Sequence, residues 1–388
     1  MHVRVTAALI ATALLVTGCT TVAGTAVPEP QAQALHGGTG GLPTAPREAT
    51  APGAQRKVLA ANTLSDRMVL PTDIDRSLTV GNPQTAVRAS NLVALDGLDQ
   101  DRLAKRGMLY GFSEVREAPD RATSGDGITI TLVRMPDEAA AKGAVEDLRT
   151  QEKARAVAVP GRDDIPAYKI PAGDNRVFTT ITGYAAFGPL LLIASPRSKD
   201  EGKLVGWLTK AVDLQRDRLA GFTSPASADL ANLPVDKDGI VGLTVTPDRI
   251  EPGRFEQYWG FQTRTAQLHW MDDPVKAAAL FDEVGMDLVG VGTNAVYRTR
   301  DGQAAARMLE QLTKDLAAEA GATAFTIDGL PSAQCRSVPL DTSPYSSATA
   351  KHTCYVAVGR YMSAYTGIQL ERTRQVTAAA YLVLRSAK

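Results

Sequence analysis

The chain has 388 residues, of which 44% are hydrophobic, so it is long enough for two ordinary domains and too apolar to be disordered throughout. Its 42 basic and 42 acidic side chains give a formal net charge of +0. A nucleic-acid partner requires an excess of basic residues to displace counterions, so the composition argues against nucleic-acid binding.

The N-terminal stretch is typical of an export signal. The apolar run Val5–Val16 is too short for a membrane-spanning helix, which needs roughly 20 residues. It ends in Leu15–Cys19, where an aliphatic residue and small residues precede a cysteine, an ending that resembles the lipobox of bacterial lipoproteins. The thiolate of Cys19 can accept a lipid as a thioether, and two or more acyl chains give a stable anchor. An ordinary secretory signal is the alternative.

Residues 19–57 are rich in Ala, Gly, Pro and Thr and have no apolar periodicity. We interpret them as a flexible tether between the anchor and the folded part. The chain is therefore expected to have a signal peptide over residues 1–18 and to sit on the extracytoplasmic face of the cell membrane, which it contacts through lipid on Cys19.

The rest of the chain contains similar sequences in the same order. Leu70–Asp75 matches Leu233–Asp238, and Val133–Asp137 matches Tyr297–Asp301, at offsets of about 164 residues. Several matches at a nearly constant offset indicate a tandem duplication. We place the first repeat at residues 58–221 and the second at residues 222–388.

Within each repeat the apolar pattern switches between the strand period of two and the helical period of 3.6. The predicted strands are Gly127–Met135, Ala167–Ile170, Arg176–Tyr184, Pro189–Ala194, Gln334–Val338 and Thr353–Met362. The predicted helices are Asp137–Lys153, Asp200–Leu219, Ala304–Leu316 and Arg374–Leu384. Hairpin-connected strands between isolated helices predict an α+β fold of two related repeats, each an antiparallel sheet with packed helices.

Three cysteines are an odd number for an exported protein, and lipidation accounts for one. The other two, Cys335 and Cys354, are predicted to form a disulfide. Metal ligation together with His352 and a reactive thiol are the alternatives. In the first repeat we align the two cysteines with Ile170 and Val177, which favours packing over reactivity.

Two histidines remain for catalysis beyond the signal and the tether, His269 and His352. His269 is close to Asp272 and Asp273, but Asp273-Pro274 is an ordinary helix start. The chain has no Gly-x-Ser-x-Gly elbow and no His-Glu-x-x-His motif.

Other suggestive motifs have simpler interpretations. Gly290–Ala295 fits a loose dinucleotide pattern, but a strand rather than a helix follows it. The pairs Asp73/Asp75 and Asp236/Asp238 lack the remaining ligands of a calcium loop and are predicted to form turns and caps. We therefore predict no cofactor and no metal.

Five aromatic side chains lie in predicted strands and would line a groove for an apolar or glycan ligand or pack in the core. They are Tyr184, Phe187, Tyr355, Tyr361 and Tyr365.

With the lipobox, the tether and the duplicated unit, the chain resembles actinobacterial lipoproteins of a family of unknown function. The resemblance rests on architecture and implies an envelope-facing protein, without a substrate or site residues. Because sites favour the junction between domains, we predict non-catalytic binding of a small apolar or glycan ligand, or of an envelope protein, at the junction of the repeats. The alternatives are an envelope hydrolase or transferase that uses His269 or His352, and a structural spacer.

Overall fold

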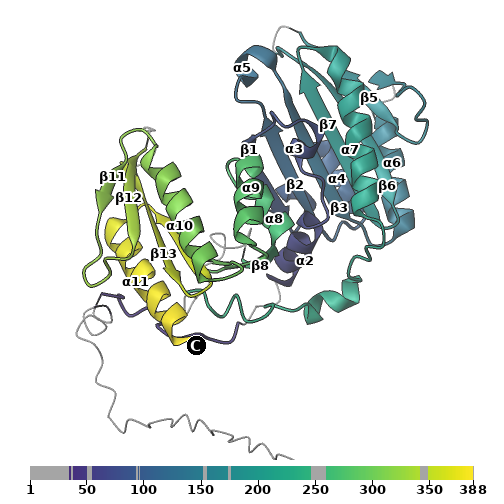
Figure 1. Ribbon diagram of the computed structural model, residues 1–388. Coiled ribbons are helices and arrows are strands. Elements are labelled where there is room, and N and C mark those ends of the chain that lie inside the picture. Colours follow the sequence, from purple (N-terminus) through teal and green to yellow (C-terminus); the bar gives the residue numbers. More distant parts are fainter. Residues whose placement is uncertain are drawn as a thin grey trace, which may run out of the picture.

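The computed structural model describes residues 35, 38–49, 55–92, 95, 97–151, 155–173, 176–245, 259–340 and 348–387 (Figure 1). The predicted signal peptide and Cys19 lie outside these residues. The described part of the chain has no helix that is long and apolar enough to cross a membrane.

The described residues form two seven-stranded antiparallel sheets, one in each half of the chain. The first sheet has the order β1-β2-β3-β7-β6-β5-β4 and the second has the order β11-β12-β13-β14-β10-β9-β8. The strands of the first are β1 Val80–Ala86, β2 Tyr110–Glu117, β3 Gly127–Arg134, β4 Ala156–Val157, β5 Ala167–Ile170, β6 Thr179–Phe187 and β7 Leu190–Ser198. The strands of the second are β8 Gly260–Thr263, β9 Leu288–Val291, β10 Ala295–Arg298, β11 Thr323–Phe325, β12 Gln334–Pro339, β13 Ala350–Val358 and β14 Tyr361–Gly367.

The two sheets have the same connectivity. Read from the first strand of each half, both place their strands in the order first, second, third, seventh, sixth, fifth, fourth. An arrangement this specific, repeated along one chain, confirms the predicted two-repeat α+β fold.

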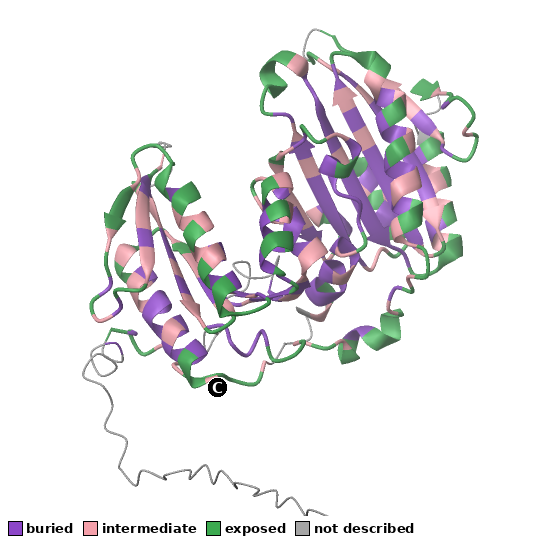
Figure 2. Ribbon diagram, in the orientation of Figure 1, coloured by how far each residue is buried: buried purple, intermediate pink, exposed green. Residues whose placement is uncertain are grey.

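Helices cover both faces of each sheet, and the strands between them are mostly buried (Figure 2). In the first repeat, α4 and α6 pack on one face and α2 and α7 on the other. In the second repeat, α9 and α10 pack on one face and α11 on the other. The helices are α2 Gln55–Ser65, α3 Pro71–Ile74, α4 Gly97–Lys105, α5 Arg121–Ser124, α6 Glu138–Gln151, α7 Leu204–Arg218, α8 Arg264–His269, α9 Pro274–Val284, α10 Gly302–Ala317 and α11 Leu370–Ser386. Short 3₁₀ turns occupy Ala89–Asn91, Glu201–Lys203 and Ser227–Asn232.

Matched local signals start matched elements in the two repeats. The Asp137 carboxylate accepts a hydrogen bond from the Ala140 N–H at the start of α6, and Asp301 accepts one from Ala304 at the start of α10. Each cap satisfies a backbone donor that the first helical turn leaves free.

The predicted strand Thr353–Met362 is wrong in one respect, because it contains a hairpin turn. Gly359 has φ +55° and separates β13 from β14, as Gly188, also at φ +55°, separates β6 from β7. Glycine adopts this left-handed conformation without steric cost.

Part of the segment predicted to be a flexible tether is packed against the second repeat. Leu42 lies against Val376 and Ala379 of α11, and the Arg47 N–H donates to the Gly242 carbonyl. We call residues 38–49 the strap. The remainder of the predicted tether includes the start of α2, which begins at Gln55.

The core of the first repeat extends past its predicted boundary at residue 221. Leu230, in the 3₁₀ turn Ser227–Asn232, is buried in the same cluster as the first sheet. The connection between the repeats therefore runs along the first repeat before it enters the second.

Candidate functional site

Helix α8 follows the first strand of the second sheet and lies between the two repeats (Figure 1). Thr263 starts it, because its hydroxyl accepts a hydrogen bond from the Ala266 N–H. At the other end of α8, the backbone carbonyls of His269 and Met271 accept hydrogen bonds from Arg116 of β2, at 2.7 and 2.8 Å. An element of the second repeat is thus held by the first sheet.

A fully buried group of ionisable side chains makes this contact. Glu114, Arg116 and His269 are each 0% exposed. The Arg116 guanidinium donates to Glu114, and the other carboxylate oxygen of Glu114 lies 2.5 Å from His269 Nδ1. The His269 ring also packs edge-on against Phe112, with centroids 5.3 Å apart. We call Glu114, Arg116 and His269 the latch.

The latch explains the cluster around His269 without catalysis. The imidazole is enclosed, and its carboxylate partner is Glu114 of the first repeat, not Asp272 or Asp273. Asp273 instead caps α9, accepting from the Val275 and Lys276 N–H groups as the sequence predicted. The repeats are joined here by the hydrogen bonds from Arg116 to the His269 and Met271 carbonyls and by the contact of Glu114 with His269.

Beside α8, the two repeats enclose a hollow of about 270 Å³, which we call the junction pocket. Helix α2 contributes Leu59, Asn62 and Thr63 to its wall, and the turn after it contributes Asp66. The connection between the repeats contributes Pro225, Leu233 and Pro234. The second repeat contributes Phe261, Gln262, Thr263 and Ala266. All three segments that meet at the junction therefore line it.

The wall of the junction pocket contains polar atoms without a partner. Gln262 is 2% exposed, and neither its Oε1 nor its Nε2 has a hydrogen-bond partner among the described residues. Asn62 is 3% exposed; its Nδ2 donates to the Trp259 carbonyl at 3.3 Å, and its Oδ1 has no partner in the same part of the chain. Buried polar groups are nearly always hydrogen-bonded, so these atoms are exceptions. Each of them is enclosed by the protein and is not exposed in the hollow.

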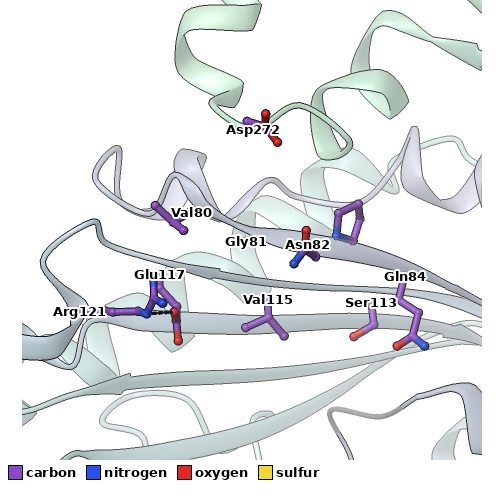
Figure 3. A pocket seen from close by; sticks show the side chains of 10 residues that line it. Val80, Gly81, Asn82, Gln84, Ser113, Val115, Glu117, Arg121 and Asp272 are labelled. Atoms are coloured by element: carbon purple, nitrogen blue, oxygen red, sulfur yellow. Dashed lines mark ion pairs between the residues drawn. The ribbon is translucent and has the colours of Figure 1, made fainter. Parts of the chain in front are cut away.

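A larger hollow of about 750 Å³ lies along β1 and β2 (Figure 3). Asp272, from the loop after α8, faces it across from Asn82. The Ser113 hydroxyl in its wall is bonded to Thr131 at 2.7 Å, and Arg121 pairs with Glu117 at 2.7 Å. These internal partners make it a weaker candidate than the junction pocket.

A third hollow, of about 240 Å³, lies beside α8 and is lined by arginines. Arg218 pairs with Asp73 at 2.6 Å, and Arg264 pairs with Asp282 at 2.7 Å. Because carboxylates already occupy two of its cations, it does not present a strong anion site.

Burial changes the acidity of tyrosines in the two cores. It raises the pKa of Tyr110, in the first sheet, to about 12, although the nearby positive charge of Arg134 opposes the shift. It also raises the pKa of Tyr297, whose hydroxyl lies 3.3 Å from the Gln267 amide of α8. Both phenols therefore stay neutral at physiological pH.

The second predicted histidine lies far from the junction. His352 is on β13, where its Nδ1 is 2.8 Å from the Ser337 hydroxyl and its ring packs edge-on against Phe325. No carboxylate of the described residues hydrogen-bonds to it. The structure therefore does not bring the two histidines into one site.

Cys335 and Cys354 form a disulfide, as predicted. The alignment with Ile170 and Val177 is wrong, because Val177 is 66% exposed and outside any strand. The error came from matching Gly183 to Gly359, whereas Gly188 is the hairpin glycine that corresponds to Gly359.

The remaining motifs are structural. Asp236 accepts hydrogen bonds from the Val241 and Gly242 N–H groups, and Asp238 pairs with Arg298 at 2.9 Å. Gly290–Ala295 spans the end of β9, the turn and the first residue of β10, so a strand and not a helix follows it. Among the residues that the structure describes, no group of three or more His, Cys, Asp or Glu side chains could hold a metal ion.

Of the two roles predicted for the five aromatic side chains, the structure shows packing in the cores. Tyr355 packs in the cluster with α9 and α10, Tyr361 in the cluster with Trp259, and Tyr365 against α11. Tyr184 and Phe187 pack in the first repeat.

Sequence reasoning missed the latch and the polar wall of the junction pocket. A signal for the latch was present, because strand alternation places Glu114 and Arg116 on the same face as the core residue Phe112. No comparable signal marked Gln262 or Asn62, because the pocket brings together residues about 200 positions apart in the chain.

The fold and the site define the class of this protein: it is a tandem α+β protein with a pocket where its repeats meet. The chain belongs to the family described as "Domain of unknown function (DUF7373)". The N-terminal model of this family matches residues 47–235 and its C-terminal model matches residues 241–387.

Two further comparisons were made. A search of curated proteins found no match. Among solved structures, the extracellular domain of PknH from Mycobacterium tuberculosis is similar with 9% sequence identity and a TM-score of 0.26. That match covers 39% of this chain and 94% of the PknH chain.

Proposed function

We propose that this chain is a lipid-anchored protein of the extracytoplasmic membrane face that binds a small ligand in the junction pocket without catalysing a reaction. The observation that carries the binding proposal is the hollow of about 270 Å³ between the repeats, whose lining is mostly apolar and includes the polar residues Asn62, Thr63 and Gln262. Ligand sites are typically hollows with a mostly apolar wall and a few convergent polar groups, often at domain interfaces.

The anchor is supported by the sequence Leu15–Cys19 after a short apolar run. Cys19→Ala should leave the protein unlipidated, abolish its partition into the detergent phase and leave the signal uncleaved. Phase separation and mass spectrometry of the membrane fraction test this. A Cys19→Ala protein that still partitions as a lipoprotein would refute the anchor.

Binding is tested by closing the junction pocket. Ala266 is 1% exposed on α8 and lines it, so Ala266→Leu fills space that a ligand would use. Ala317→Leu, at an exposed position on α10, is the matched control. A small-molecule library screened by ligand-observed NMR should give ligands that bind the wild type and Ala317→Leu and fail to bind Ala266→Leu. If no ligand shows that dependence, the proposal fails.

The alternative, an envelope hydrolase or transferase, is left with His352, since His269 is enclosed. The 2.8 Å contact of Ser337 with His352 is the observation that favours it. A nucleophile and a base need such proximity, but a third group usually orients the base. Loss of hydrolysis of a p-nitrophenyl ester in Ser337→Ala, with Ser346→Ala unchanged, would favour the enzyme. Equal background rates would exclude this pair.

A further inference from the structure

We infer that the junction pocket takes a small, uncharged, apolar molecule, about the size of one ring with a short alkyl chain, and recognises it by shape and apolar contact. The inference rests on the proposed function and specifies the chemical class of its ligand. Three properties of the described wall carry it: its polar side-chain atoms are enclosed or already paired, its charge is one paired carboxylate, and the rest of its surface is mostly apolar.

The two amides of the wall are out of a ligand's reach. The unpaired side-chain atoms of Asn62 and Gln262 are enclosed by the protein. The remaining amide atom of Asn62, Nδ2, donates to the Trp259 carbonyl at 3.3 Å. Neither amide can therefore orient a polar ligand in the hollow.

The two hydroxyls of the wall are paired within the protein. Thr63 Oγ1 donates to the Leu59 carbonyl, one turn earlier in α2, at 3.0 Å. Thr263 Oγ1 donates to the Asp66 carboxylate and accepts from the Ala266 N–H. Because a hydroxyl has one hydrogen, neither threonine has a donor left for a ligand.

The charge of the wall argues against an ionised ligand. Of the described residues that line the pocket, Asp66 is the only charged one. Besides its hydrogen bond from Thr263, it lies 3.7 Å from the Arg67 guanidinium. An anion would meet this carboxylate without a cation in the described wall, and a cation would compete with Arg67. An uncharged ligand avoids both costs.

The connection between the repeats adds apolar surface. Pro225 and Pro234 have no backbone N–H, and the Leu233 carbonyl accepts a hydrogen bond from Arg56. With the ring of Phe261 from β8, these residues make the lining mostly apolar. Moving an apolar group from water onto such a surface is favourable without any hydrogen bond.

The volume sets the size of the ligand. An apolar cavity of about 150 Å³ can hold benzene. The junction pocket, at about 270 Å³, has room for a few more carbon atoms beside one ring. A glycan fits poorly, because its hydroxyls would lose their water partners and find no free side-chain donor in the described wall.

The experiment uses the full chain and three probes that differ in one terminal group. Propylbenzene ends in a methyl group, 2-phenylethanol has a hydroxyl in its place, and 2-phenylethylammonium has a charged amine there. Titration by ligand-observed NMR should show that propylbenzene binds more tightly than either of the others by about tenfold or more, since both would bury a polar group without a partner. Ala266→Leu should abolish that binding, and Ala317→Leu should leave it unchanged.

Two further variants test the wall without filling buried space. Thr63→Val replaces a hydroxyl by a methyl group, and it should bind propylbenzene as tightly as the wild type or more tightly. Leu233→Asn puts an amide into the apolar wall at a half-buried position and should weaken propylbenzene binding about tenfold. Leu312→Asn, at a half-buried position of α10, is its control. Thermal unfolding without probe shows that each variant is folded, and Leu233→Asn still tests the site if Ala266→Leu is not.

The outcomes distinguish the two levels of the proposal. If 2-phenylethanol or 2-phenylethylammonium binds as tightly as propylbenzene and loses binding in Ala266→Leu, the apolar class is wrong while the junction site stands. If Thr63→Val weakens propylbenzene binding about tenfold, the hydroxyl contacts the ligand and the inference is overturned. If no probe depends on Ala266 or Leu233, the inference fails, and the proposed function fails with it when the library screen is also negative.

Discussion

The two repeats differ in the length of one hairpin, which β2 and β3 form in the first repeat and β9 and β10 form in the second. Arg134 pairs with Leu190 in the first sheet, and Arg298 pairs with Tyr361 in the corresponding strands of the second. We call these two equivalent pairs the shared row. Counted from the shared row, β2 and β3 each have 8 residues, whereas β9 and β10 each have 4. The hairpin turn between β9 and β10 therefore lies at a level where β2 and β3 of the first repeat still continue.

The additional length of the first hairpin carries the residues that join the repeats. Glu114 and Arg116 lie in the part of β2 that has no counterpart in β9, and they hold α8 of the second repeat. At the equivalent place the second hairpin turns through Asn294, whose side chain bonds to Ser363 and to the Val245 N–H within its own repeat. One copy of the duplicated unit has therefore kept a short, self-contained hairpin, and the other has an extension that makes the interface.

A second difference lies in the middle of the sheets. Cys335 pairs with Cys354 across β12 and β13, and counting from the hairpin glycines places Ala167 and Gly183 at the same positions in the first repeat. A Cβ atom on Gly183 would lie 2.8 Å from Leu208 of α7. In the first repeat, a leucine from the covering helix thus occupies the space that the disulfide occupies in the second repeat.

Removing the latch cation should have the largest effect. Arg116→Met leaves Glu114 buried beside His269 without its main partner, and breaking a buried charge pair in this way costs about 3–5 kcal/mol. Arg298→Met, in the second repeat, removes ion pairs whose carboxylates, Asp238 and Asp287, are exposed to water, and should cost about 1 kcal/mol or less. Urea unfolding followed by tryptophan fluorescence measures both. Equal losses from the two variants would contradict the assignment of the interface to the longer hairpin.

Removing the disulfide should have the next largest effect. Cys335→Ala with Cys354→Ala opens a loop whose ends are 19 residues apart, which should reduce stability by about 2–4 kcal/mol. Thermal unfolding under non-reducing conditions measures the loss.

The comparison also predicts how to move this crosslink to the first repeat. Ala167→Cys with Gly183→Cys should fail to stabilise the chain while Leu208 fills the space, and should form a disulfide when Leu208→Ala is added. Mass mapping of the unreduced protein decides. A bond that forms with Leu208 in place would show that the leucine and the disulfide do not occupy equivalent space.

Much of this fold was predictable because its signals are local. Alternation predicted a strand over Gly127–Met135, which is β3, and Asp137 marked the start of α6, since both signals depend on neighbours within a few residues. The strap was not predictable, because Leu42 is ordered by contacts with α11, more than 300 positions later, and has no periodic pattern of its own. The polar wall of the junction pocket was missed for the same reason, since Gln262 is made significant by Asn62 of another repeat.

The strap offers a smaller test of how the second repeat is covered. Leu42→Ala should reduce stability by about 1 kcal/mol, because Leu42 is half-buried against Val376 and Ala379. Leu98→Ala, which is 60% exposed in the first repeat, should change stability by less than about 0.5 kcal/mol. Hydrogen exchange should then show faster opening of α11 with α7 unaffected. Faster exchange in both helices would mean that the strap does not act on the second repeat alone.

The smallest effect concerns the charges beside the shared row. In the second repeat, the hydrogen bond from Arg298 holds the pKa of Asp287 below its ordinary value, against the opposing effect of burial. The corresponding residue of the first repeat is Leu109, and Arg134 there donates to the carbonyls of Met135 and Pro136 instead. A carboxyl with a lowered pKa stabilises the folded state above its ordinary pKa of about 3.9, and this stabilisation is lost as the pH falls through the lowered value.

Asp287→Asn should therefore reduce stability by at most about 1 kcal/mol at pH 7, because the pair is half exposed and screened by water. The difference from the wild type should shrink as the pH falls below 4 and disappear once Asp287 is protonated in the folded protein. It should also shrink in 1 M salt, where the Debye length is about 3 Å. Urea unfolding of both proteins at pH 7, 5 and 3 measures it, and Arg298→Gln should remove the same pH dependence. A difference that grows toward pH 3 would mean that another group on this row, not Asp287, distinguishes the acid response of the two repeats.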